Sequence, residues 1–221
     1  MADRGYRGRP SRSERADRQI NAGHSRALDA ALARTEARIR NLKTEMIYAF
    51  DENGKELAHS TTGSEHSTQL PKGNYDDAII THNHPQAWMS GKGLGERVGT
   101  PFSASDIVTT AMFNAKEIRS VTRGGYTFSI KRPKGGWKTN ILNANKMITK
   151  ITTKVAQIYH KYLMAEAERN RQRWGVSTSP DEKYNKLFYE RNHINAVHQA
   201  LKELSKEYGF EYTRKRTYSF D

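Results

Sequence analysis

A short sequence, His-Asn-His-Pro at residues 82–85, holds the side chains best suited to chemistry in this chain. It ends a predicted strand, where residues two apart face the same side, so both imidazoles can reach one metal ion. Further along, Ser103 and Asp106 share a face in the first turn of a predicted helix. Two imidazoles, one carboxylate and one open position are typical of a catalytic zinc site. We therefore predict that His82, His84 and Asp106 bind Zn²⁺.

Hydrolysis at such a site needs one more group, a carboxylate that takes a proton from the water. Glu45 is the candidate by position, because it stands at the start of a predicted strand where an electrically neutral part of the chain begins. Glu52 and Glu56 are the alternatives. The chain contains no cysteine, which excludes thiolate sites, so any metal must be held by His, Asp or Glu.

Each of these features also has an ordinary interpretation. The two histidines are then a solvent-exposed pair at a strand end. Ser103 and Asp106 are then a plain helix cap, and a glutamate before a strand is common. The occurrence of all of them in this order favours the metal site.

In combination, these motifs resemble the signature of the JAB/JAMM (MPN-plus) metalloproteases, and His-Asn-His-Pro is similar to the RadC-like branch in particular. Residues 45–136 are also similar to JAB-type domains of phage head-morphogenesis proteins and toxin-like modules. The resemblance implies that Glu45 activates the water and that Ser103 supports the transition state. It assigns the zinc to His82, His84 and Asp106. The link over 86–102 is longer than in compact family members, and we expect it to bulge outward and to help select the substrate.

The resemblance implies a zinc metallopeptidase or isopeptidase of JAMM type. Its substrate would be a protein or a ubiquitin-like conjugate. The alternative is a phage- or DNA-associated JAB-like module that binds or assembles through its basic flanks without protease activity. A RadC-like role in DNA metabolism is a third hypothesis.

Positive charge is concentrated in both flanks of the chain. The formal net charge is +13, of which residues 1–44 carry +6, residues 45–136 none and residues 137–221 +7. This division predicts a neutral catalytic core between basic flanks that bind nucleic acid or another polyanion. The alternative is that the basic surfaces only keep the protein in solution.

Hydrophobic periodicity and turn residues predict the elements that must position the site. We expect helices over 25–43, 105–116, 140–172 and 181–208, strands over 46–50, 55–60, 78–82, 118–122, 126–131 and 210–218, and a loop over 83–102. The predicted fold class is α/β, a curved mixed sheet with flanking helices plus a basic helical hairpin, and the resemblance makes the core JAB/MPN-like. We divide the chain into a flexible basic arm (1–24), the zinc hydrolase core with its leading helix (25–136) and a basic helical extension with a terminal strand (137–221).

Several other functions are disfavoured. The contiguous His-Asn-His does not satisfy the HNH nuclease motif, whose residues are dispersed along the chain. The glycines over 91–99 follow no predicted strand and lack the ending of a phosphate-binding loop. His193 and His198 are five apart on a predicted helix, too far round it to chelate one ion. No apolar run approaches the ~20 residues of a membrane span, and we see no secretory signal. We expect no membrane partner and a cytoplasmic location, with association with a virion as the alternative.

Overall fold

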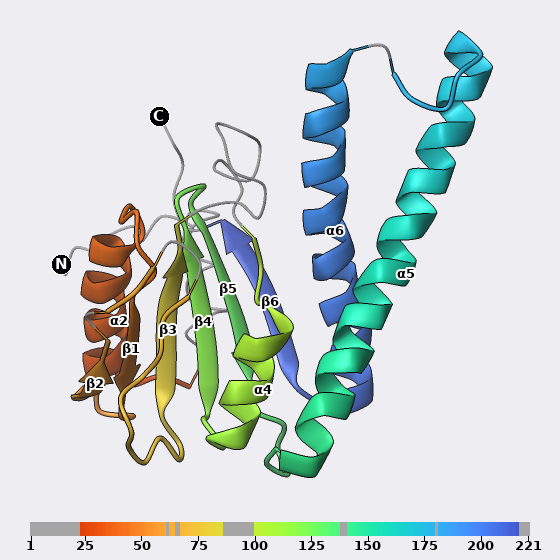
Figure 1. Cartoon of the computed structure of the whole chain (residues 1–221). Helices are drawn as coiled ribbons and strands as arrows, with labels where there is room; N and C mark the ends of the chain where they lie inside the picture. Colours follow the sequence, from red (N-terminus) through yellow and green to blue (C-terminus); the bar gives the residue numbers. More distant parts are fainter. Residues whose placement is uncertain are drawn as a thin grey trace, which may run out of the picture.

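A six-stranded mixed sheet forms the centre of the computed structural model, which describes residues 23–60, 62–64, 67–85, 100–137, 141–179 and 181–216 (Figure 1). Its strands are β1 (Ile47–Phe50), β2 (Glu56–His59), β3 (Ile79–His84), β4 (Glu117–Thr122), β5 (Tyr126–Lys131) and β6 (Glu211–Arg216). Their order is β2-β1-β3-β4-β5-β6, and β3 with β4 is the parallel pair in an otherwise antiparallel sheet. The predicted α/β class is therefore confirmed.

Helices cover both faces of this sheet. The described helices are α2 (Arg26–Ile39), α4 (Ala104–Met112), α5 (Ile141–Trp174) and α6 (Glu182–Tyr208). Figure 1 shows α2 on one side of the sheet and α4 on the other, next to α5. The helices α5 and α6 pack against each other as a long hairpin that extends beyond the strands. None of the described helices has both the length and the apolar character needed to cross a membrane.

The two faces of the sheet are built by alternation along the strands, since successive strand residues point to opposite sides. Phe50 and Ile79 are buried with the apolar residues of α2. Their neighbours Ala49 and Ile80 are buried in a larger cluster on the other face, together with residues of α4, α5 and α6. The site therefore sits above a core that continues from the sheet into the helical hairpin.

The predicted elements form, with shifted ends. The helix predicted over 25–43 ends at Ile39, and the helix predicted over 105–116 is Ala104–Met112. The strand predicted over 78–82 continues to His84, because its last residues pair with β4 as far as Thr122. The remaining predictions correspond to β1, β2, β4, β5, β6, α5 and α6.

Two predictions fall mainly outside the described residues. The flexible arm predicted over 1–24 is described only from residue 23, and the loop predicted over 83–102 is described up to residue 85 and again from residue 100. Nothing in the structure bears on the remainder of these segments.

A buried ionic cluster joins α2 to the sheet. Arg119 of β4 lies between two carboxylates, with Nε donating to Glu36 Oε1 (2.6 Å) and Nη1 donating to Glu117 Oε1 (3.1 Å). The ring of His24 lies 2.7 Å from the other oxygen of Glu117. Burial raises the pKa of Glu117, but the bond with His24, the charge of Arg119 and a bond from Ser129 outweigh it and hold that pKa at about 2. The cluster therefore depends on an ionised Glu117.

The helical hairpin belongs to a long segment that leaves the sheet and returns to it. Lys131, the last residue of β5, is paired with Glu211, the first residue of β6. Residues 132–210 thus connect two adjacent antiparallel strands. Gly209, which has a φ of 75°, caps α6 with an N–H bond to the carbonyl of Ser205. The chain then continues into β6.

Candidate metal centre

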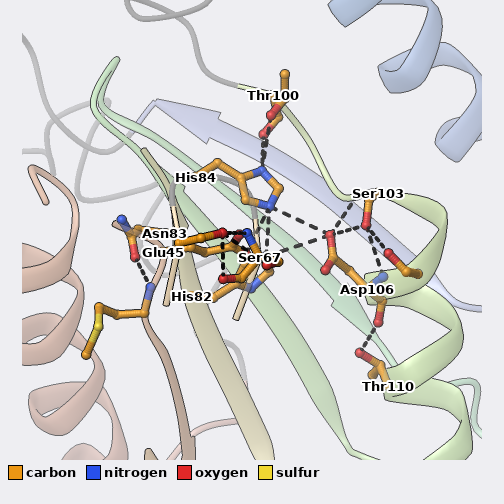
Figure 2. A network of polar contacts seen from close by, with 12 residues as sticks. Glu45, Ser67, His82, Asn83, His84, Thr100, Ser103, Asp106 and Thr110 are labelled. Atoms are coloured by element: carbon orange, nitrogen blue, oxygen red, sulfur yellow. Dashed lines mark hydrogen bonds and ion pairs between the residues drawn. The ribbon is translucent and has the colours of Figure 1, made fainter. Parts of the chain in front are cut away.

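Four potential metal ligands from three separate elements meet at one end of β3. His82 and His84 lie on β3, Glu45 lies two residues before the start of β1, and Asp106 is in the first turn of α4. Each contributes one atom to a group in which all atoms lie within 4.8 Å of one another (Figure 2). The sheet explains the convergence, because β1 and β3 are neighbours and α4 follows β3 as the crossover to β4.

Three of these atoms are spaced to hold one ion. The Nε2 atoms of His82 and His84 are 2.9 Å apart, and Asp106 Oδ2 lies 3.8 and 3.7 Å from them. A point equidistant from the three atoms is about 2 Å from each, which is the bond length of zinc to imidazole nitrogen and carboxylate oxygen. The donor set and its spacing therefore fit a metal ion.

Glu45 lies slightly further from the two imidazoles than Asp106 does. Its Oε1 lies 4.0 Å from both Nε2 atoms, and the side chain is only 10 % exposed. The side chains of His84 and Asp106 are 12 and 21 % exposed, so the cluster opens to solvent on their side. Glu45 is thus placed beside the centre, where a carboxylate can contact a small molecule held there.

A backbone contact sets the tautomer of His84. Its Nδ1 lies 3.0 Å from the carbonyl oxygen of Thr100, which can only accept, so Nδ1 carries the hydrogen. In the neutral ring the Nε2 lone pair is then available to a metal ion. Burial lowers the pKa of His84, but the hydrogen bond with Asp106 and the charges of Asp106 and Glu45 outweigh burial. The pKa of His84 is therefore raised above its ordinary value.

The first turn of α4 positions Asp106. Ser103 caps the helix, and its backbone N–H and its hydroxyl both donate to Asp106 Oδ2 at 2.7 Å. Burial raises the pKa of Asp106, but the charge of His82 and the hydrogen bonds with both histidines outweigh it and hold this pKa well below its usual value. Asp106 is therefore an anion that faces the two imidazoles, the state that a metal ligand requires.

The backbone around Glu45 is fixed by the residue between the two histidines. Asn83 is fully buried, and its side-chain oxygen accepts from Met46 N at 2.7 Å while its amide donates to the Thr44 carbonyl at 3.0 Å. On the other side, a Cβ at Gly63 would lie 1.7 Å from the Glu45 carbonyl oxygen, so only glycine permits this approach. The carboxylate of Glu45 is thus aimed by contacts on both sides.

A groove of about 860 Å³ runs from the metal centre to the helical hairpin. This volume lies in the range of about 300–1,000 Å³ that is common for ligand sites. One wall holds Phe102 and the start of α4, and the other holds residues of α5 and α6 that include Val155, Tyr159 and Val197. In the described part of the lining there is no lysine or arginine. The groove is therefore mainly apolar, with acidic groups at the centre.

Comparisons of this chain with protein-family models, with curated proteins and with solved structures find no match. The site is therefore interpreted from its own geometry.

All five residues singled out in the sequence lie at this site, whereas the alternative glutamates do not join it. Glu52 pairs with Lys116, and Glu56 lies 2.6 Å from His59 at the edge strand β2. Ser103 contacts Asp106 and lines the groove. The sequence interpretation missed Asn83, Thr100 and the contribution of α5 and α6 to the groove. The asparagine between the two histidines was the one local signal among them.

The two histidines of α6 have separate environments. The His193 ring packs edge-on against Tyr159 with ring centroids 5.5 Å apart, at the groove. Nδ1 of His198 lies 3.0 Å from the hydroxyl of Tyr212. Burial, together with the charges of Arg214 and Lys202, lowers the pKa of His198 to about 4. Neither histidine is part of the cluster of metal ligands found among the described residues.

Proposed function

We propose that this protein is a zinc-dependent hydrolase that cleaves peptide or isopeptide bonds. The observation that carries the proposal is the convergence of four side chains, Glu45, His82, His84 and Asp106, on one point. Three donor atoms surround a point at about the bond length of zinc, and the carboxylate of Glu45 stands 4.0 Å from both imidazoles. A centre built only for structure closes four ligands on the ion, whereas a catalytic centre keeps one position open.

The roles of the residues follow from their places. When bound, zinc supplies Lewis acidity and lowers the pKa of its water towards ~7. Glu45 accepts a proton as the carbonyl is attacked and passes it to the leaving amine. The Ser103 hydroxyl, which donates to Asp106 at 2.7 Å, is close enough to the centre to turn and donate to the developing oxyanion.

The groove supports a peptide rather than a nucleic acid as the substrate. A polyanion is bound mainly through lysine and arginine contacts with its phosphates. The described lining of the groove has none, although the whole chain has a net charge of +13. The basic residues and the metal centre therefore serve different partners in this proposal.

The assignment to the JAB/JAMM type is part of the proposal. Its support is that the glutamate, the His-Asn-His-Pro and the Ser-x-x-Asp, far apart in sequence, lie around one point. The strand that carries the histidines, β3, is followed in the order of described elements by α4, which Ser103 caps and which carries Asp106. A protein or ubiquitin-like conjugate is the substrate that this type implies.

Metal analysis tests the centre directly. The protein refolded with excess zinc should hold about one zinc per chain, and His82→Ala should hold far less. The matched control is His59→Ala, which removes a half-exposed histidine on β2 that pairs with Glu56. Two imidazoles and one carboxylate also suit iron, so iron is measured alongside zinc. We expect zinc to be the metal that is retained. A folded protein without zinc would overturn the proposal.

Activity is tested on a panel of peptides and ubiquitin-like isopeptide linkages. The zinc-loaded protein should cleave at least one of them, and His82→Ala should cleave none. A folded, zinc-loaded protein that cleaves no member of the panel would instead support the second candidate, a phage- or DNA-associated module that acts by binding.

One observation favours a polyanion partner in addition to hydrolysis. The edge strand β6 carries Arg214, Lys215 and Arg216 in succession. On α5, by contrast, Lys150 and Lys154 are paired with Glu207 and Glu203 of α6, so this part of the basic charge is balanced locally. The basic charge of β6, where Arg214 and Arg216 lie over the ring of Tyr126, is therefore our candidate surface for binding nucleic acid.

A further inference from the structure

We propose that the α5–α6 hairpin is the specificity wall of the groove and that the site prefers a peptide with a bulky apolar side chain beside the scissile bond. This inference rests on the proposed hydrolase function and names its substrate class. The groove contains Glu45, His84 and Asp106 at one end and the hairpin at the other. A peptide whose carbonyl reaches the metal centre therefore places a neighbouring side chain against α5.

The residues that face the groove from the hairpin are apolar or uncharged. Val155 and Tyr159 of α5 are partly buried and pack with Ile158, while Val197 of α6 packs with the main core. The opposite wall is formed by Phe102, which is 2 % exposed, and by Ala104. Burial of an aliphatic or aromatic side chain against such a surface is favourable, whereas a charged side chain makes no favourable contact there.

The titratable residues of this wall are His193 and Tyr159, and both are uncharged near neutral pH. Burial raises the pKa of Tyr159. Burial lowers the pKa of His193, whose ring packs edge-on against Tyr159. Lysine and arginine are missing from the described lining. An acidic or phosphorylated peptide thus finds no counter-charge among the described residues of the lining, and the carboxylates that these residues offer to a lysine side chain are Glu45 and Asp106 at the metal centre.

The wall is rigid enough to select. Ile151 of α5 is 3 % exposed and belongs to the same core cluster as Ile80 and Phe128 of the sheet. The hairpin wall is therefore tied to the strand that carries the two histidines, so its distance from the centre is set by core packing. A fixed distance between the metal centre and the apolar wall allows the site to discriminate between side chains of different size and polarity.

Hydroxamates that chelate zinc provide probes with a defined side chain. One series, the hydroxamates of N-acetylglycine, N-acetylleucine and Nα-acetyllysine, places the side chain on the acyl side of the scissile bond. A second series, malonyl hydroxamates that carry the same three side chains on the malonyl carbon, places it on the amine side. We expect the leucine probe to bind about tenfold more tightly than the glycine probe in one series, as measured by calorimetry on the zinc-loaded protein.

The decisive variant is Val155→Asp. It should abolish the preference for leucine and create a preference for the lysine probe, a switch that loss of stability cannot produce. Ala156→Asp, at an exposed position of the same wall, should act in the same direction and guards against misfolding of the first variant. The matched control is Thr153→Asp, on the same helix but lining a different hollow, which should keep the preference for leucine.

A second measurement does not depend on the metal. A pentapeptide with a photoreactive leucine analogue between glycines should crosslink to residues 151–159 in the metal-free protein, less so in Val155→Asp and equally in Thr153→Asp. Crosslinks elsewhere, or equal affinity for all three side chains in both hydroxamate series, would overturn the inference. Absence of zinc with crosslinks on α5 would overturn the proposed hydrolase and leave the apolar wall in place.

Discussion

The side-chain oxygen of Asn83 lies 2.7 Å from the backbone nitrogen of Met46, the residue that follows Glu45. With the bond from its amide to the Thr44 carbonyl, the Asn83 side chain spans the backbone on both sides of Glu45. The residue between the two histidines thus fixes the backbone from which the Glu45 side chain extends. In this way β3 carries two of the proposed metal ligands and also holds the segment of the proposed proton acceptor.

Asn83→Ala should separate these two tasks. Without the asparagine, the backbone beside Glu45 is no longer fixed, but His84 and Asp106 keep their own hydrogen bonds to Thr100 and Ser103. We expect zinc to be retained and turnover to fall by about 10²-fold, the scale of a misplaced proton acceptor. Stability should fall by about 1–3 kcal/mol, because the backbone N–H of Met46 loses its partner. Zinc content, turnover and thermal unfolding report the three effects. Loss of zinc in this variant would contradict the prediction.

Glu45→Gln and Asp106→Asn should differ in what they lose. Glu45→Gln keeps the shape and removes the proton-accepting carboxylate, so the protein should keep its zinc and lose turnover by ~10²-fold or more. Asp106→Asn should lose both metal and activity, since a neutral amide is a poor zinc ligand. Glu56→Gln, at the edge strand, is the matched control and should retain both. Full activity in Glu45→Gln would remove Glu45 from the mechanism, and loss of zinc there would make it a ligand.

Acid should destabilise the metal-free protein through Glu117. Its folded pKa of about 2 lies below the ordinary value of 4.5, so the carboxylate contributes stability above pH 4.5 that is lost as the pH falls towards 2. Such a difference corresponds to about 3 kcal/mol in the free energy of unfolding. In Glu117→Gln this part of the acid dependence should disappear, as measured by urea unfolding between pH 2 and 7. Glu211→Gln, at an exposed position at the start of β6, is the control and should leave the dependence unchanged. The same slope in wild type and Glu117→Gln would show that the ionic cluster has no such role.

Binding to DNA or RNA should weaken steeply with salt if the basic flanks are its interface. Replacing Arg214, Lys215 and Arg216 together by glutamine should flatten that slope by up to about three counterions. Removal of residues 1–22 should flatten it further. The matched control is the pair Lys150→Gln and Lys154→Gln, whose charges are balanced within the hairpin. Binding that does not change with salt would leave the net charge of +13 as a solubility feature.

Local patterns made much of the fold predictable. In the sequence, Tyr126, Phe128 and Ile130 alternate with polar residues, which is the period of a strand, and the structure finds all three in one core cluster. Turn glycines such as Gly125, with a φ of 76°, marked the hairpins. Side-chain types and spacing were enough to nominate the metal ligands, because a strand and a helix start each determine which way their residues face.

Features that depend on tertiary pairing were not predictable. The extension of β3 to His84 requires the parallel partner β4, which lies more than 30 residues further on. The role of Asn83 depends on the antiparallel pairing of β1 with β3. The apolar residues along one face of α5 indicate that this face is covered. The sequence does not show whether α6, the sheet or a bound peptide covers it, because this depends on how the elements pack. Val155 and Tyr159 serve the hairpin and the groove at once.

The direct pairing of Lys131 with Glu211 gives the chain a modular character. In topological terms, residues 132–210 take the place of the loop in a single β-hairpin, and this segment contains the two long helices α5 and α6. Every proposed ligand and the proton acceptor precede this loop, whereas one wall of the groove lies within it. Substitutions or exchanges within residues 132–210 can therefore change what the groove accepts while the proposed ligands and proton acceptor stay in place, so selectivity and the proposed chemistry are open to separate change.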